Sequence, residues 1–300
     1  MNKKDFIESL SRLKDRSKGT LSENSFSEIL ISLHKERFNK IQSFKLELLA
    51  TIYEQIRNTK GTEALETCRK IVLLECLLNS WNNIFSEKYP TSIQDQFKKN
   101  SERMLNMCEN SEGWGVYGDD VYWKDLAIAR QQMFPAGGGR IVEAYSGFGF
   151  RQGFSINLSQ SFSFFKLLFC SGGRKGYYQG HLHTPLLSDF NEQGFYDCNI
   201  GIAEMLIKHE EIKGVFGSTW YYDPQLENIS PRLMYVQKIP LENGAKLFYI
   251  GEDRTGNAFA KSKTRLKLYN EGKYKPKKYL MVWPRKELIK WARTCIGENM

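Results

Sequence analysis

Residues 177–222, YYQGHLHTPLLSDFNEQGFYDCNIGIAEMLIKHEEIKGVFGSTWYY, contain the pattern that decides the fold class. Short runs of aromatic and β-branched residues at 177–183 and 212–222 predict two β-strands. Between them, apolar residues recur at helical spacing over residues 191–209 and predict an amphipathic helix. A strand, a helix and a second strand in succession are typical of an α/β sheet.

The rest of the second half continues this alternation. Further strands are expected at residues 140–145, 163–169, 246–250 and 278–283, and further helices at 230–237, 257–269 and 285–295. Ser230 followed by Pro231 is a favourable helix start, because Ser caps the first turn and Pro fits the first helical position. Residues 111–300 are therefore predicted to form a mixed α/β domain.

Residues 1–110 differ in composition, with Pro90 as the only proline and Gly19 and Gly61 as the only glycines. Apolar residues recur there at helical spacing, and helices are expected at residues 4–15, 22–57, 62–85 and 92–108. We predict an α+β protein with a helical bundle domain over residues 1–110, a boundary near residues 109–113 and the mixed α/β domain over residues 111–300. The bundle is expected to brace the second domain or to form a homodimer.

Composition and charge narrow the functional classes. The 300 residues hold 43 Lys and Arg against 34 Asp and Glu, and residues 241–300 carry 14 of these cations but only 6 of the anions. No apolar run approaches the roughly 18 residues that span a bilayer, and the first residues are charged where a signal peptide would be apolar. The six cysteines form no CxxC pair. We therefore expect a cytoplasmic protein with no membrane span, in a reducing compartment.

The strand at 177–183 contains the densest polar cluster. Side chains alternate along a strand, so His181 and His183 are expected on one face, where two imidazoles suit a metal ion or a substrate. Asp189 or Glu192 would complete a site of two histidines and one carboxylate, as in metal-dependent oxygenases and hydrolases. No spacing sets the third ligand, and the alternative is a histidine pair that is only hydrogen-bonded, as is common at the end of a strand.

A second cluster, GVFGSTWYYDP at residues 214–224, predicts a pocket beside the next strand. Glycines inside a strand permit a ligand to approach the backbone, and Trp220 would form a flat wall, with Ser218 and Asp223 as polar substrate contacts. In the alternative interpretation the aromatic residues are sheet core and Asp223–Pro224 turns the chain.

Two basic segments are candidates for phosphate binding. The glycine-rich run at 172–176 contains Arg174 and Lys175 and is either a backbone nest for phosphate or a hairpin turn. The run at 261–278 is expected to be partly helical and to bind a phosphate-bearing donor, an acidic carrier protein or nucleic acid. Its candidate contacts are Lys261, Lys263, Arg265 and Lys267. The alternative is a solvated charged face.

From Phe134 onward the chain resembles a family of bacterial proteins without an assigned activity, which share segments such as GSTWYYDP at 217–224, ISPRL at 229–233 and VWPR at 282–285. The order of elements is also similar to the acyltransferase core of the GNAT superfamily, including its N-acyl amino acid and acyl-homoserine lactone synthases. That resemblance implies that the strand at 177–184 separates from its neighbour and binds the pantetheine arm of the donor. It also implies that helix 191–209 lies beneath the pyrophosphate.

The GNAT superfamily's R/Q-x-x-G-x-G/A loop is missing, and residues 186–191, LLSDFN, stand in its place. An acyl-carrier protein or an aminoacyl-tRNA needs that loop less than acyl-CoA does, and all three remain candidate donors. The similarity implies an acyl or aminoacyl transferase that acts on an amine with a thioester or tRNA-linked donor. Such a transfer needs a base and an acid. The candidate bases are His181, His183 and Glu143, and the candidate acids are Tyr222 and Tyr235.

The functional hypotheses are therefore three. The first is the acyl or aminoacyl transferase, which needs no metal ion. The second is a metal-dependent oxygenase or hydrolase that uses His181 and His183. The third is a non-enzymatic protein that binds anions or nucleic acid through residues 261–278, with a steep dependence on salt.

Overall fold

The computed structural model describes residues 3–17, 29, 33, 44–109, 114, 119–154 and 157–297. The chain divides into two compact units. Unit 1 comprises Met1–Pro135 and His183–Ser188, and unit 2 comprises Ala136–Leu182 and Asp189–Met300. This division lies later in the chain than the boundary predicted near residue 110, because helix α6 (Asp119–Ala129) packs against α4 of the helical unit. Residues 110–113 of the predicted boundary lie outside the described residues.

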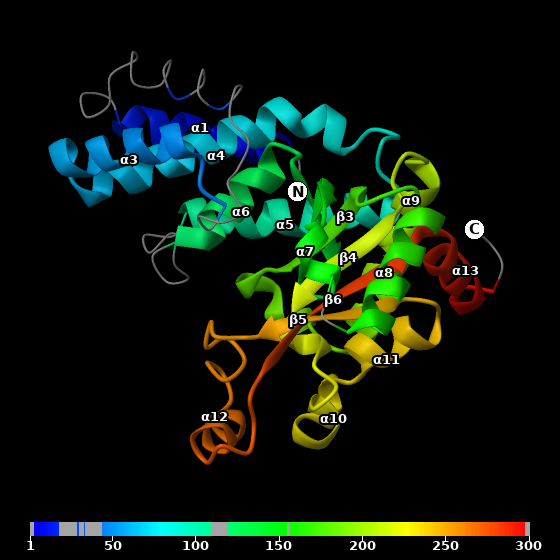
Figure 1. Ribbon diagram of the computed structural model, residues 1–300. Helices are drawn as coiled ribbons and strands as arrows, with labels where there is room; N and C mark the ends of the chain where they lie inside the picture. The colour runs from blue at the N-terminus through cyan, green and yellow to red at the C-terminus, as the bar shows by residue number, and fades with distance from the viewer. Residues whose placement is uncertain are drawn as a thin grey trace. The chain divides into compact units, whose positions relative to one another are not determined.

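Unit 1 is helical, as the blue to teal part of Figure 1 shows. Besides α6, its helices are α1 (Lys3–Ser17), α3 (Glu47–Lys60), α4 (Thr62–Ile84) and α5 (Thr91–Glu109). The helix expected at 22–57 is described only from residue 44 apart from Ile29 and Leu33, and α3 is its described helix. Helix α4 buries consecutive residues on all sides, and α1, α3, α5 and α6 pack on it, so it is the centre of the bundle.

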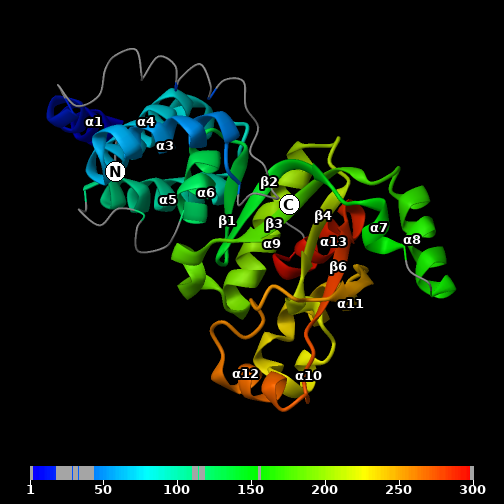
Figure 2. The ribbon, with the colours of Figure 1, turned by 60° about the vertical axis from the view of Figure 1, so that its left-hand side comes forward.

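The sheet has six strands in the order β1-β2-β3-β4-β6-β5. The strands are β1 (Met133–Gly137), β2 (Arg140–Gly147), β3 (Lys175–Leu182), β4 (Gly214–Thr219), β5 (Lys246–Glu252) and β6 (Lys277–Pro284). Strands β3 and β4 are parallel, whereas β2–β3, β4–β6 and β5–β6 are antiparallel. Strand β6, drawn in red, lies beside β4 (Figure 2). The sequence prediction omitted β1, whose central Pro135 is unusual inside a strand.

Helices cover both faces of the sheet in unit 2. On one face, α7 (Phe150–Gly153) and α8 (Leu158–Cys170) lie over the core, where the ring of Phe164 contacts that of Phe248 on β5 at 5.2 Å. On the other face, α13 (Arg285–Cys295) packs against β4 and β6, and the ring of Trp291 lies 5.1 Å from that of Trp283. Helix α9 (Glu192–Lys208) packs beside α13.

The strand predicted at residues 163–169 is wrong, because these residues belong to helix α8. The Asn157 side chain caps this helix by accepting hydrogen bonds from the backbone N–H groups of Ser159 and Gln160, at 3.0 and 3.4 Å. Phe164 and Leu167, three residues apart, are both buried, which is helical rather than strand spacing.

The chain after β4 also differs in detail from the prediction. β4 ends at Thr219, and a 3₁₀ turn covers Trp220–Tyr222. The helices that follow are α10 (Leu226–Ile229), α11 (Tyr235–Glu242) and α12 (Lys263–Asn270), so α12 begins six residues later than expected. Among the described residues, no helix is both long and apolar enough to cross a membrane.

Candidate functional site

The parallel strands β3 and β4 are joined by a short ladder. Only the pairs Tyr178–Val215 and Gln179–Phe216 belong to it, although β3 continues to Leu182 and β4 to Thr219. In open α/β sheets, ligands bind outside the carboxyl ends of such strands. The side chains beyond this ladder are therefore the candidate functional site of unit 2.

His181 and Glu143 form a pair on the sheet face that α8 covers. Glu143 lies opposite Gln179 and His181 lies opposite Ile141, so the two side chains are diagonal neighbours across β2 and β3. His181 Nε2 is 3.7 Å from Glu143 Oε2, and both side chains are largely buried, at 15% and 9% exposed. A carboxylate beside a partly accessible imidazole can orient it and stabilise its protonated form, as a general base requires.

Ser218 faces the same side of the sheet as this pair. Phe216 on β4 and Gln179 on β3 are ladder partners, so they share a face. Ser218 lies two residues after Phe216 and His181 two residues after Gln179, which puts both on that same face. The hydroxyl of Ser218 is buried and has no hydrogen-bond partner within the described part of the chain. Buried hydroxyls are almost always hydrogen-bonded, so Ser218 offers a donor to a bound ligand.

Arg140 lies on the opposite face of the sheet. It precedes Glu143 by three residues in a regular stretch of β2, so the two side chains project to opposite sides. Its guanidinium lies 4.9 Å from the ring centre of Phe195 and 6.0 Å from that of Phe190. No described acidic side chain forms an ion pair with Arg140, which leaves this partly buried cation able to bind an anion.

Aromatic rings surround Arg140. The ring of Tyr235, on α11, lies 5.6 Å from Phe195 and 6.3 Å from Phe190, and that of Tyr221 lies 5.3 Å from Phe190. The Tyr235 hydroxyl is buried without a hydrogen-bond partner among the described residues. Burial raises the pKa of Tyr235, and the nearby charge of Arg140 opposes this rise. The sequence prediction included Tyr235 but missed Arg140 and both phenylalanines; an arginine opening a strand directly after three glycines was the available signal.

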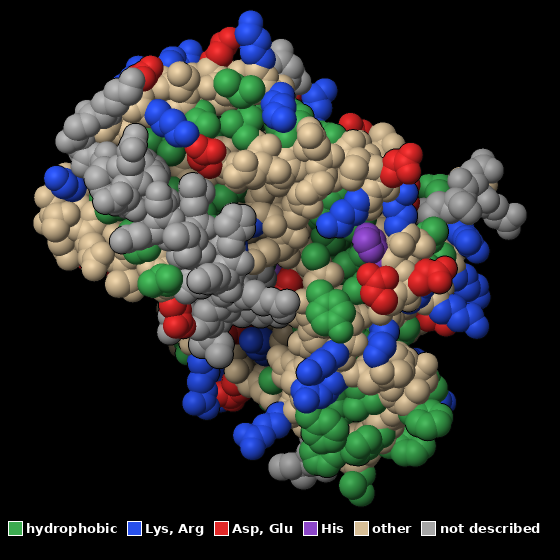
Figure 3. Space-filling model, turned by 90° about the horizontal axis from the view of Figure 1, so that it is seen from above, with side chains coloured by type: hydrophobic (Ala, Val, Ile, Leu, Met, Phe, Trp, Pro, Cys, Tyr) green, Lys and Arg blue, Asp and Glu red, His purple; other side chains and the backbone are tan. Residues whose placement is uncertain are grey.

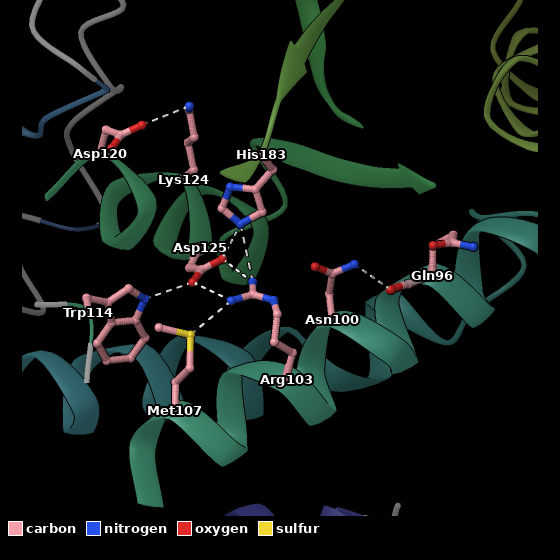
Figure 4. A network of polar contacts seen from close by, with 9 residues as sticks. All are labelled: Gln96, Asn100, Arg103, Met107, Trp114, Asp120, Lys124, Asp125 and His183. Atoms are coloured by element: carbon pink, nitrogen blue, oxygen red, sulfur yellow. Dashed lines mark hydrogen bonds and ion pairs between the residues drawn. The ribbon is translucent and has the colours of Figure 1, made fainter. Parts of the chain in front are cut away.

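His183 does not share a site with His181, contrary to the alternation prediction. Strand β3 ends at Leu182, and His183 belongs to unit 1, where it contacts Asp125 of α6 (Figure 4). His183 Nε2 lies 2.8 Å from Asp125 Oδ1, and both side chains are fully buried. A fully buried imidazole in this position cannot meet a substrate in this conformation, so the structure does not support His183 as the base.

Asp125 is the centre of this buried network. Arg103 of α5 donates to both carboxylate oxygens, with Nη1 at 3.1 Å from Oδ2, and Trp114 Nε1 donates to Oδ2 at 2.8 Å. Burial alone would raise the pKa of Asp125, but Arg103 and His183 hold it well below its usual range. Burial lowers the pKa of His183, so the imidazole is neutral beside an ionised carboxylate. The network is structural, and it fixes the segment His183–Ser188 in unit 1.

The positions of the histidines also bear on the metal hypothesis. His181 has Glu143 as its acidic neighbour, whereas His183 has Asp125. Within the described residues, no group of three or more His, Cys, Asp or Glu side chains is arranged to hold a metal ion. The predicted ligand set of His181, His183 and a third carboxylate is therefore not assembled there.

Arg265 is a second correction, because it is buried rather than part of an exposed basic face. Its guanidinium lies 4.8 Å from the ring centre of Trp220 and donates to Ser230 Oγ at 3.0 Å, while its Nε donates to the carbonyl of Ala258. Trp220 is itself buried and stacks on Tyr221 at 4.0 Å. Trp220 therefore belongs to a small hydrophobic core of unit 2, and Arg265 lies against it.

Asp223 and Tyr222 are also internal. The buried Asp223 carboxylate accepts hydrogen bonds from the backbone N–H groups of Gln225 at 3.0 Å and Lys277 at 2.9 Å, so it holds a turn to β6. Burial raises the pKa of Asp223, and these two backbone groups oppose the rise. The Tyr222 hydroxyl lies against Gly217, where an added Cβ would come within 2.7 Å of it. These contacts favour the structural alternative for both residues.

The remaining predicted contacts lie on the surface. Arg174, in the turn between α8 and β3, and Lys175, the first residue of β3, are exposed, and in this turn Gly172 presents its carbonyl to the ammonium of Lys213 rather than an N–H group to an anion. Lys261, Lys263 and Lys267 are exposed, and Lys267 lies 3.8 Å from Glu271. The structure thus separates Arg265 from the three lysines with which the sequence grouped it.

Comparisons with known proteins assign no function to this site. No protein-family model, no curated protein and no solved structure matches the chain.

Proposed function

We propose that the chain is an acyl or aminoacyl transferase, which moves an acyl group from a thioester or tRNA-linked donor to an amine. The observation that carries this proposal is the short β3–β4 ladder, with His181 and Glu143 on one face and Arg140 and Tyr235 on the other. The strand order β1-β2-β3-β4-β6-β5, with its single parallel pair among the ladders described, is similar to GNAT acyltransferase cores. This similarity is at the level of topology and supports the proposal only in combination with the site.

The acceptor amine would bind on the face of His181. The amine nitrogen attacks the donor carbonyl carbon, an N–C bond forms, and the C–S or C–O bond to the donor breaks. His181 takes the proton that the amine loses, and the neighbouring Glu143 stabilises the resulting imidazolium. The Ser218 hydroxyl, which lacks a partner among the described residues, would hydrogen-bond to the substrate on this face.

The donor would bind on the face of Arg140 and extend its reactive carbonyl to the face of His181 between the ends of β3 and β4, which are not paired beyond Gln179 and Phe216. Its phosphate or carboxylate groups would meet the guanidinium, and its apolar parts would lie against Phe190 and Phe195. Tyr235 would protonate the departing thiolate or ribose oxygen and recover its proton through solvent. Burial raises the pKa of Tyr235 above its ordinary value, so the phenol carries the required proton at neutral pH.

The test is a transfer assay with purified protein, a panel of amines, and acyl-CoA, acyl-carrier protein and aminoacyl-tRNA as donors, read by mass spectrometry. His181→Asn should reduce the transfer rate by about 10²- to 10⁴-fold, the usual contribution of a general base. A matched control is His209→Asn, because His209 also pairs with a glutamate, Glu211 at 3.3 Å, away from the proposed site. Absence of transfer with every donor, or equal rates for the two variants, would overturn the proposal.

A further inference from the structure

Helix α8 is apolar on two faces. One face is buried against the sheet through Phe164 and Leu167. The other presents a stripe at spacings of four, three and four residues, which places it on one side of the helix. Its members and their exposed fractions are Leu158 at 85%, Phe162 at 73%, Phe165 at 48% and Phe169 at 90%.

Helix α7 and the residue after it extend this stripe. Phe150 and Phe154 are 42% and 49% exposed, their rings stack with centres 5.7 Å apart, and Phe165 contacts both rings at 5.8 and 5.9 Å. We call the six residues the Phe patch: Phe150, Phe154, Leu158, Phe162, Phe165 and Phe169. Hydrophobic side chains also gather at the lower right of the face drawn in Figure 3, with cationic side chains beside them. A contiguous exposed apolar surface of this kind marks a site of interaction.

The charge along the segment that carries the Phe patch is of one sign. Residues 144–188 contain four Lys and Arg residues and no Asp or Glu. The four are Arg151, Lys166, Arg174 and Lys175, and all are exposed. None of them forms an ion pair with a described acidic side chain. The segment therefore suits a surface that has an apolar layer and anionic groups at its boundary with water.

We propose that α7 and α8 form a docking surface for an anionic lipid membrane. A helix with aromatic residues on one side and cations around it lies in the membrane interface, where apolar insertion and electrostatic attraction add together. The 13 residues of α8 are too few to span a bilayer. The surface would bind at the membrane boundary and leave the fold of unit 2 unchanged.

Two features of the Phe patch favour lipid over a protein partner. In a symmetric dimer of this chain the Phe patch would meet the same patch of the second copy. The four cations of residues 144–188 would then face the same four cations of that copy. Protein interfaces also carry about one hydrogen bond per 100–200 Å². The Gln160 amide beside the patch donates both of its N–H groups to the carbonyls of Gly153 and Tyr249, at 3.1 and 3.0 Å, so it has none left for a protein partner.

The experiment is co-sedimentation of the full chain with vesicles of phosphatidylcholine alone and of phosphatidylcholine with phosphatidylglycerol. The wild type should bind the anionic vesicles and bind the neutral ones much more weakly. The double variant Phe162→Ser/Phe169→Ser should lower the affinity by about tenfold or more, because it removes the two aromatic side chains most available for insertion. Lys166→Glu/Arg174→Glu should lower binding to the anionic vesicles alone and weaken its dependence on salt.

The matched control is Ile207→Ser/Leu266→Ser, two apolar residues that are 37% and 41% exposed outside the patch. This variant should bind as the wild type does, and circular dichroism should confirm that all variants are folded. Failure of the wild type to bind anionic vesicles, or equal binding by the Phe162/Phe169 variant, would overturn the proposal. A dimer in sedimentation equilibrium that this variant disperses, without vesicle binding, would assign the patch to a second copy instead.

Discussion

Replacing Asp125 by Asn tests the buried network in unit 1. The change keeps the shape of the side chain but removes its charge and replaces one acceptor oxygen by an NH₂ donor, which then faces the donors of Arg103, Trp114 or His183. Removal of one partner of a buried ion pair costs about 3–5 kcal/mol. The Arg103 side chain is 17% exposed, so solvent relieves part of this cost. We expect the free energy of unfolding to fall by about 3 kcal/mol, the lower end of that range.

Urea unfolding followed by circular dichroism measures this loss. With a slope of about 3 kcal/mol per molar urea, the midpoint should move by about 1 M. The matched control is Asp120→Asn on the same helix, because Asp120 is 40% exposed and, among the described residues, pairs only with Lys124 four positions later, at 3.1 Å. That variant should change stability by less than about 0.5 kcal/mol. Equal midpoints for the two variants would refute the stabilising role of the network.

Acid stability, donor binding and the packing of α12 provide three further tests. Stability should fall as the pH drops below about 6.5, because burial lowers the pKa of His183 and the unfolded chain then takes up a proton that the folded chain excludes. Protonation of Asp125 should add to this loss below about pH 4, and His183→Gln should remove the first step from a series of melting curves. Arg140→Ala should raise the KM for an anionic donor about tenfold with little change in melting temperature. The control Arg254→Ala, at a side chain that is 87% exposed, should leave the KM unaltered. An equal rise in KM for both variants would contradict the role of Arg140 in binding the donor. Arg265→Ala should lower stability by about 2 kcal/mol through loss of its contacts with Trp220 and Ser230, whereas the exposed Lys263→Ala should change it by less than about 0.5 kcal/mol in the same unfolding assay.

Sequence patterns predicted the elements whose burial is periodic. The strand–helix–strand unit at residues 177–222 was correct in type, and α13 matched its predicted range of 285–295. Helix α8 was misassigned because its Phe and Ser residues resemble a strand, and because two apolar faces hide the helical period. Its start at Asn157 depends on a side-chain cap, which was the local signal available in the sequence.

The candidate site was predicted less completely, because the partner of a polar residue is set by tertiary structure. Alternation along a strand placed His183 beside His181, but the strand ends one residue earlier and Asp125, 58 residues away in sequence, takes His183 as its partner. The pairing of His181 with Glu143 required the register of β2 against β3. Neither relation can be read from the spacing of residues within one segment.

Three arginines illustrate how the partner decides the role. Arg103 is neutralised by the Asp125 carboxylate, and Arg265 lies on the face of Trp220 with its donors on a hydroxyl and a carbonyl. Arg140 has aromatic rings around it but no acidic partner among the described residues. A partly buried guanidinium has lost solvation that only an anion restores in full. Binding of an anion at Arg140 would restore the solvation that the folded chain has lost there, which is why we propose this face of the sheet for the donor.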